Sequence, residues 1–253
     1  MYFTRFPINL TRRESRRFLG SPYIFHAAIA GSFPPGGNSE EGRVLWRVDT
    51  VDNGGMYLYI VSPTKPSLVG LNEQIGWPDM PNQWETKSYD TFLKEIHDGQ
   101  LYAFRLVANP VLNSVNVRDK HNKTKRIGHL TVLQQATWLV GADAYADLPV
   151  SQTSSSTNRR QSRAARNGFK VIANPKTDIP ELVVSHSKKS IIQKRNAADP
   201  ITLVTAQYDG IMQVVDANAL RRALTFGIGH AKGFGCGLLT IVPLAKHEQS
   251  SRF

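Results

Sequence analysis

The chain has 253 residues, which is long enough for two domains of ordinary size, and 41% of them are hydrophobic, so it can form a packed core without disulfides or metals. Its 31 lysines and arginines exceed its 20 acidic residues, giving a formal net charge of +11. This surplus favours a polyanionic partner, nucleic acid rather than membrane, although a plain basic surface has the same composition. The single cysteine, Cys236, excludes an intramolecular disulfide and a cysteine-rich zinc site, and is typical of a cytoplasmic protein.

The opening residues predict a strand over 2–8 and then a basic helix. Thr11 and Glu14 have the spacing of a capping box, in which the Glu14 side chain reaches back to the Thr11 amide. The uncharged stretch 18–39 that follows four arginines resembles a secretory signal. Polar residues and Pro34 interrupt its apolar part, so we expect neither a secretory leader nor a membrane span.

A second helix is predicted from Pro22 to about Phe33, with Ser21 as its N-cap. Tyr23 and His26 are three residues apart and therefore share one face of this helix. RNA cleavage without a metal needs a group that titrates near neutrality, which makes His26 the candidate catalytic residue and Tyr23 its candidate assistant. A structural histidine beside a tyrosine on an apolar helix has the same pattern.

Two β-rich runs, 43–49 and 56–61, flank the turn residues 52–55 and predict a hairpin, so the first part of the chain has the order βαββ. Residues 63–89 contain four prolines and are expected to be an irregular connection between two halves of the chain.

The second half repeats this alternation of strands and helices. Its predicted elements are a strand at 101–109, a helix at 130–145, a hairpin of 201–208 and 211–215 across Asp209-Gly210, a helix capped by Asp216 and ending near Phe226, and a strand at 238–242. The chain is therefore expected to be α+β, with two tandem ferredoxin-like (RRM-like) βαββαβ domains over residues 1–88 and 89–253.

Basic residues gather in three separate segments that contain only Glu14 and Asp119 as acids. A solvated helix face or loop normally mixes both signs of charge, so phosphate binding explains the three segments better together than a solvated surface does. The candidate RNA-binding residues are Arg12, Arg13, Arg16 and Arg17; Arg118, Lys120, Lys123, Lys125 and Arg126; and Arg159, Arg160, Arg163, Arg166 and Lys170.

Residues 227–237 contain five glycines among eleven residues, which permits close approach of the backbone to a phosphate. A tight turn between a helix and a strand is the alternative. A dinucleotide-binding loop would follow a strand and open a helix, whereas this segment follows a helix and opens a strand. The sequence has no phosphate-loop motif, no His-Glu-x-x-His and no carboxylate cluster, so we predict neither a cofactor nor a metal site.

Over most of its length the chain resembles the CasE-type CRISPR-associated endoribonucleases of type I-E systems. Residues 227–239 carry the most specific likeness, to the glycine-rich loop and closing strand of that family. The supporting segments are residues 1–5, the Tyr23-x-x-His26 helix, residues 104–110 and the turn 208–210.

This resemblance implies two ferredoxin-like domains that bind the hairpin of the CRISPR repeat and cut at the base of its stem. The attack of a 2′-hydroxyl without metal would leave a cyclic phosphate, and the enzyme would stay on the mature guide RNA within a Cascade complex, beside the backbone subunit at the 3′ hairpin. His26 and Tyr23 match the family's catalytic histidine and tyrosine, and Gly229 and Lys232 of the glycine-rich loop would contact the RNA.

Two departures from the family pattern accompany this resemblance. Residues 27–31 lack the basic or hydroxyl residues that some relatives place after the histidine, so charge stabilisation must come from elsewhere. The segment 151–168 is also longer than expected, and its arginines would follow the RNA stem. A catalytically silent RNA-capping subunit is the alternative function, and a nucleotide-dependent enzyme built on residues 227–237 is a third.

Overall fold

The computed structural model describes residues 1–36, 38–52, 54–81, 83–118, 124–145, 162–192 and 201–244, with the side chains of 113–118 and 124–125 excepted. The chain forms two compact units. The first contains Met1–Ile96, Ile191–Thr202 and Leu224–Leu238, and the second contains His97–Ser190, Leu203–Ala223 and Leu239–Phe253. The glycine-rich segment is thus grouped with the N-terminal residues, and a domain boundary near residue 88 stays a prediction.

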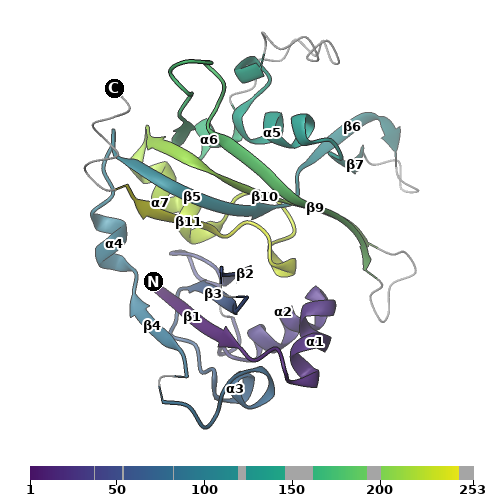
Figure 1. Ribbon diagram of the computed structural model, residues 1–253, viewed down its shortest axis with the longest axis vertical. Coiled ribbons are helices and arrows are strands. Elements are labelled where there is room, and N and C mark those ends of the chain that lie inside the picture. The colour runs from purple at the N-terminus through teal and green to yellow at the C-terminus, as the bar shows by residue number, and fades with distance from the viewer. Residues whose placement is uncertain are drawn as a thin grey trace. The chain divides into compact units, whose positions relative to one another are not determined.

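The first unit is built on a four-stranded sheet in the order β2-β3-β1-β4, in which each neighbouring pair is antiparallel. Helices precede β2 and β4, which gives the βαββαβ order of a ferredoxin-like fold. Its elements, labelled in Figure 1, are β1 (Tyr2–Ile8), α1 (Arg13–Gly20), α2 (Pro22–Ala30), β2 (Leu45–Thr50), β3 (Met56–Ser62), α3 (Val69–Ile75) and β4 (Glu85–Ser88), followed by α4 (Asp90–Lys94).

The expectation of an irregular connection over residues 63–89 is wrong, because α3 and β4 lie within it. Neither element has the local sequence pattern by which it could be predicted. Helix α3 has no side-chain cap, and the short β4 is an edge strand, exposed at Glu85, Lys87 and Ser88, that pairs only with β1 among the described strands of its sheet. An exposed polar edge strand lacks the apolar alternation by which strands are recognised.

The predicted capping box of α1 is also wrong. The Thr11 hydroxyl donates to Asn9 Oδ1 at 2.7 Å instead of receiving an amide of the helix, and the N-cap residue is Arg12. Glu14 does not reach back, because its carboxylate pairs with Arg17 one turn later at 2.8 Å. Both side chains therefore form local polar contacts that compete with the capping geometry.

The second unit repeats the ferredoxin-like order. Its sheet has the order β11-β5-β10-β8, with β9 paired to β10, and the helices α5 and α7 precede β8 and β11. The prediction of two ferredoxin-like domains is confirmed. The elements are β5 (Leu101–Ala108), the paired β6 (Val111–Arg118) and β7 (Thr124–Gly128), α5 (Val132–Val140), η1 (Asp143–Tyr145), α6 (Arg163–Arg166), β8 (Phe169–Val171), β9 (Leu182–Ile192), β10 (Ile201–Val214), α7 (Ala217–Phe226) and β11 (Leu239–Pro243).

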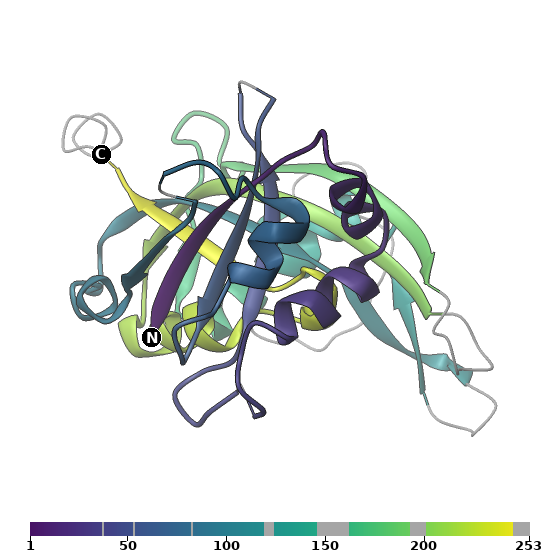
Figure 2. The same cartoon turned by 90° about the horizontal axis from the view of Figure 1, so that it is seen from below.

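The hairpin predicted across Asp209-Gly210 does not form, because both residues lie inside the long, continuous strand β10 (Figure 2). Asp209 and Gly210 pair with Arg105 and Phe104 of β5. A Cβ atom at Gly210 would lie 2.5 Å from the carbonyl oxygen of Glu181. The glycine therefore allows two backbones to approach closely and does not mark a turn.

Candidate active site

Helix α2 holds the candidate catalytic residues on its solvent side. It begins at Pro22, and the Ser21 side chain accepts a hydrogen bond from the Ile24 amide, as the sequence predicts. On the inner side, Phe25 and Ile29 are 2% and 0% exposed, and each contributes about 1.5–3 kcal/mol by burial. The Phe25 ring lies 5.0 Å from that of Trp46 in β2, so the helix is fixed to the sheet.

His26 projects from α2 toward the glycine-rich segment. A Cβ atom added at Gly233, in the short helix η2 (Lys232–Phe234), would lie 3.3 Å from His26 Nε2. Both residues line an open pocket of about 470 Å³ together with Arg43, Asn38 and apolar residues of the segment after α2. The imidazole is exposed and thus has space for a substrate atom beside it.

The environment of His26 lowers its pKa from the ordinary value of 6.5, first through partial burial and second through the positive charge of Arg43. Both effects disfavour the imidazolium. At neutral pH the neutral imidazole is therefore favoured, and this form can accept a proton from a hydroxyl group.

Arg43 is a residue of this pocket that the sequence analysis missed. It comes shortly after Glu40 and Glu41, outside the three basic segments, so no cluster of like charge marks it. The available signal was its position as the first cation after the uncharged stretch 18–39 that contains His26.

Tyr23 lies on the same helix, and its side chain is 41% exposed. Within the described part of the chain, its hydroxyl has no hydrogen bond to His26, and it is not among the residues that line the pocket. The side chain is thus accessible to a ligand, and its catalytic role stays a prediction.

The glycine-rich segment follows α7 and leads into β11, as predicted. Gly229 has a φ of 81°, and its carbonyl oxygen accepts a hydrogen bond of 2.8 Å from Lys232 Nζ. The Lys232 side chain also packs close to Gly227 and Gly237, where added Cβ atoms would lie 3.0 and 3.2 Å from its carbons. Lys232 therefore supports the loop, and contact of Gly229 or Lys232 with RNA stays a prediction.

The arginines of the first basic segment have different surroundings. Arg12 donates to the Glu73 carbonyl and Arg17 pairs with Glu14, so part of their hydrogen-bonding capacity is used within the protein. Arg13 and Arg16 are exposed, and neither forms an ion pair or side-chain hydrogen bond with any residue that the structure describes. These two are the arginines of α1 most available to phosphate.

The other two basic segments belong to the second unit. Arg118, Lys125 and Arg126 lie on the paired strands β6 and β7, with Arg126 exposed. Arg163 stacks over the Trp138 ring at 4.6 Å, while Arg166 and Lys170 are exposed. The remaining candidates, Lys120, Lys123, Arg159 and Arg160, lie outside the described residues, as does most of the segment 151–168.

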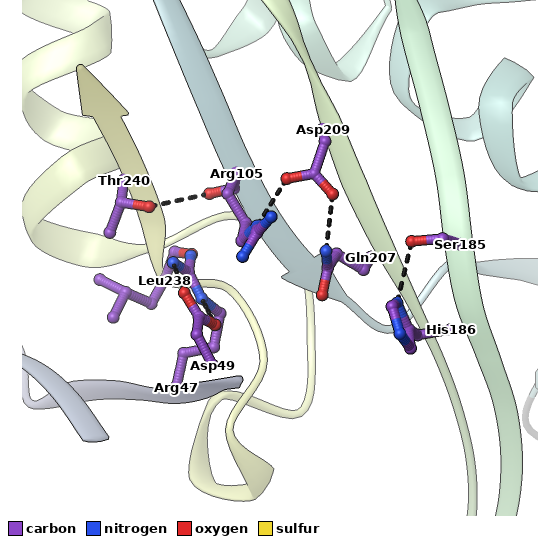
Figure 3. Close-up of polar contacts among 9 residues, drawn as sticks. All are labelled: Arg47, Asp49, Arg105, Ser185, His186, Gln207, Asp209, Leu238 and Thr240. Atoms are coloured by element: carbon purple, nitrogen blue, oxygen red, sulfur yellow. Dashed lines mark hydrogen bonds and ion pairs between the residues drawn. The ribbon is translucent and has the colours of Figure 1, made fainter. Parts of the chain in front are cut away.

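Two carboxylates that could have joined a site are instead paired with arginines. In the first unit, the buried Arg47 binds Asp49 at 2.6 Å and also the Leu238 carbonyl (Figure 3). In the second unit, Arg105 binds Asp209 at 2.5 Å between β5 and β10 (Figure 3). Both pairs stabilise the arrangement of strands and loop within their units.

The described residues contain no group of three or more histidine, cysteine, aspartate or glutamate side chains placed to share a metal ion. None of the helices described there combines the length and the apolar character needed to cross a membrane.

Known proteins match nearly the whole chain. The CRISPR-associated endoribonuclease Cse3 of Thermus thermophilus is 22% identical over 247 residues, covering 96% of this chain and all of Cse3. The structure of Thermus thermophilus Cse3 bound to an RNA representing a pre-cleavage complex matches with a TM-score of 0.68 at 20% identity, covering 96% of this chain and 98% of that one. A chain of a CRISPR RNA-guided surveillance complex matches with a TM-score of 0.55 at 18% identity, covering 96% and 100%. The model of the CRISPR-associated protein family matches residues 1–243, and the chain therefore belongs to this family, as its sequence resemblance predicts.

Proposed function

We propose that this protein is a metal-independent endoribonuclease that binds the hairpin of a CRISPR repeat in precursor RNA and cleaves at the base of the stem. The observation that carries the proposal is the pocket beside His26, where an exposed imidazole with a lowered pKa faces backbone at Gly233 and a cation at Arg43. The relative from Thermus thermophilus, a CRISPR-associated endoribonuclease solved with a pre-cleavage RNA, supports the same reading.

The chemistry needs only groups of the RNA and of this pocket. His26, as general base, takes the proton of the 2′-hydroxyl next to the scissile phosphate. The O2′–P bond forms while the P–O5′ bond breaks, and the leaving 5′-oxygen takes up a proton from water, which the His26 imidazolium returns to the solvent. The products are a 2′,3′-cyclic phosphate and a 5′-hydroxyl. Tyr23, exposed on the same helix face, orients the RNA at the mouth of the pocket.

The proposed substrate is an A-form stem, which proteins recognise mainly through phosphates, 2′-hydroxyls and shape. The exposed cations Arg13 and Arg16 in the first unit, and Arg126, Arg166 and Lys170 in the second, suit contacts with phosphates. After cleavage, the enzyme would stay on the guide RNA as a Cascade subunit. The match to a chain of a surveillance complex supports this assembly, and the proposed site of action is the cytoplasm.

The test is incubation of end-labelled repeat RNA with the wild-type protein, His26→Ala and His97→Ala in excess EDTA, with RNA binding measured in parallel. His97 is the matched control, because its side chain is exposed and only its backbone forms hydrogen bonds that the structure describes. We expect cleavage by wild type and His97→Ala, and loss of cleavage with binding retained for His26→Ala. Loss of binding with His26→Ala would make the residue structural.

A catalytically silent RNA-capping subunit is the second candidate function. This function is supported by the uncharged residues 27–31 after His26. They lack the basic or hydroxyl residues that some relatives have at this place. Tight binding of the repeat RNA with no product from the wild-type protein, with or without added metal, would favour this function over the nuclease.

A further inference from the structure

Arg43 has a firmly held backbone at the edge of the His26 pocket. Its amide donates to the Thr225 carbonyl at 3.1 Å, and the next amide, that of Val44, donates to Asn38 Oδ1 at 3.1 Å. The preceding residue packs against the same carbonyl group, because a Cβ atom at Gly42 would lie only 3.0 Å from the Thr225 carbonyl oxygen. The start of the Arg43 side chain is therefore fixed relative to Thr225 of α7 and to Asn38 within the first unit.

Among the described residues, the guanidinium of Arg43 has no hydrogen-bond or ion-pair partner that explains its position. Its Nε atom is buried and makes no hydrogen bond, and no carboxylate among the described residues forms an ion pair with the side chain. Arg47, four residues later, is the contrasting case, because its guanidinium binds both Asp49 oxygens and the Leu238 carbonyl. A desolvated donor on a cation is costly unless a ligand completes its hydrogen bonds.

The pocket places this guanidinium beside the proposed base. Arg43 and His26 both line the 470 Å³ pocket, together with Gly233. Arg43 is also the cation whose charge lowers the pKa of His26. The uncharged residues 27–31 after His26 leave the charge stabilisation of the reaction without a source on α2 itself.

We propose that Arg43 is a further catalytic residue, whose guanidinium binds the non-bridging oxygens of the scissile phosphate and stabilises the negative charge that develops there. This inference rests on the proposed nuclease function. As the O2′–P bond forms and the P–O5′ bond breaks, the phosphorane gains charge on its non-bridging oxygens. The planar fork of an arginine can donate to two of these oxygens at once. Arg43 itself gains and loses no proton.

The experiment compares Arg43→Ala, Arg43→Gln and Arg5→Ala with the wild type in single-turnover cleavage of repeat RNA in EDTA, at saturating enzyme. Arg5 is the matched control: it lies on β1 of the same unit, pairs with Glu85 at 3.5 Å and is not part of the pocket. Circular dichroism melting reports folding, and Arg43→Gln, which keeps much of the side-chain stem, carries the test if Arg43→Ala unfolds.

We expect the cleavage rate of both Arg43 variants to fall by about 100- to 1,000-fold, as for loss of one donor to a developing oxyanion. The affinity for RNA should change by less than about tenfold, since one phosphate contact is lost among many. Added guanidinium ion should restore part of the rate to Arg43→Ala and none to His26→Ala. A structural defect would not respond to guanidinium in this way.

Cleavage rates of the Arg43 variants within about threefold of the rate of Arg5→Ala would overturn the inference about Arg43. The proposed nuclease function would not be affected by this result. A loss of rate that disappears at higher enzyme concentration would also overturn it, because Arg43 would then only bind RNA. If the wild type does not cleave, the proposed function fails and the assignment of Arg43 fails with it.

Discussion

The pKa of His26 follows from its place on α2, where its ring faces the glycine-rich segment. Partial burial is the larger cause of its lowering and Arg43 the smaller one. Other cations lie on elements packed against α2, namely Lys232 of η2 and the arginines of α1, among which Arg17 is paired with Glu14. Burial and the nearby positive charge of Arg43 both disfavour a positive charge on the imidazole.

This pKa predicts the acidic limb of the pH–rate profile. If neutral His26 is the base, cleavage increases with pH until the imidazole is deprotonated, and a lowered pKa places the half-maximal rate below pH 6.5. The measurement is the single-turnover rate in EDTA from about pH 5 to 8, together with an NMR titration of the His26 ring. A half-maximal rate above 6.5, matched by the ring titration, would contradict the described surroundings of His26.

At the scale of elements, local signals predicted α2 and its cap correctly, because Ser21 and Pro22 act through the backbone of their own helix. The same reasoning failed where a residue's role depends on a contact with a segment that is distant in sequence. Gly210 was interpreted as a turn residue, although the Glu181 backbone passes too close for any side chain. Arg43 was missed for a similar reason: His26 is distant from it in sequence, and only the fold brings the two residues to one pocket.

Gly210→Ala tests this interpretation of β10. An added Cβ atom would lie 2.5 Å from the Glu181 carbonyl oxygen, so the backbone must move. We expect the free energy of unfolding to fall by about 1–3 kcal/mol, as for overpacking, measured by urea denaturation. Gly70→Ala is the control, because nothing lies within 4 Å of its added Cβ on α3. It should be neutral or stabilising by about 0.5–1 kcal/mol. Equal effects of the two changes would contradict the close approach.

At the scale of the whole molecule, the excess of 31 basic over 20 acidic residues already indicated a polyanionic partner. The alternation of strands and helices predicted two ferredoxin-like domains, and their topologies confirm this. The division of the chain was harder to predict, because Leu224–Leu238 is grouped with the N-terminal residues. This segment is remote from His26 in sequence but contributes to its surroundings. Its local sequence pattern does not indicate which of the two units it joins.

The most direct test of the central claim is the mass of the cleavage products formed in EDTA from repeat RNA and from the same RNA with a single 2′-deoxynucleotide at the mapped cleavage position. The account predicts a 2′,3′-cyclic phosphate on the upstream product and a 5′-hydroxyl on the downstream one. It also predicts that the deoxy-substituted RNA binds normally and is not cut. Cleavage of that RNA at the same bond, or a 5′-phosphate on the downstream product, would contradict attack by the 2′-hydroxyl.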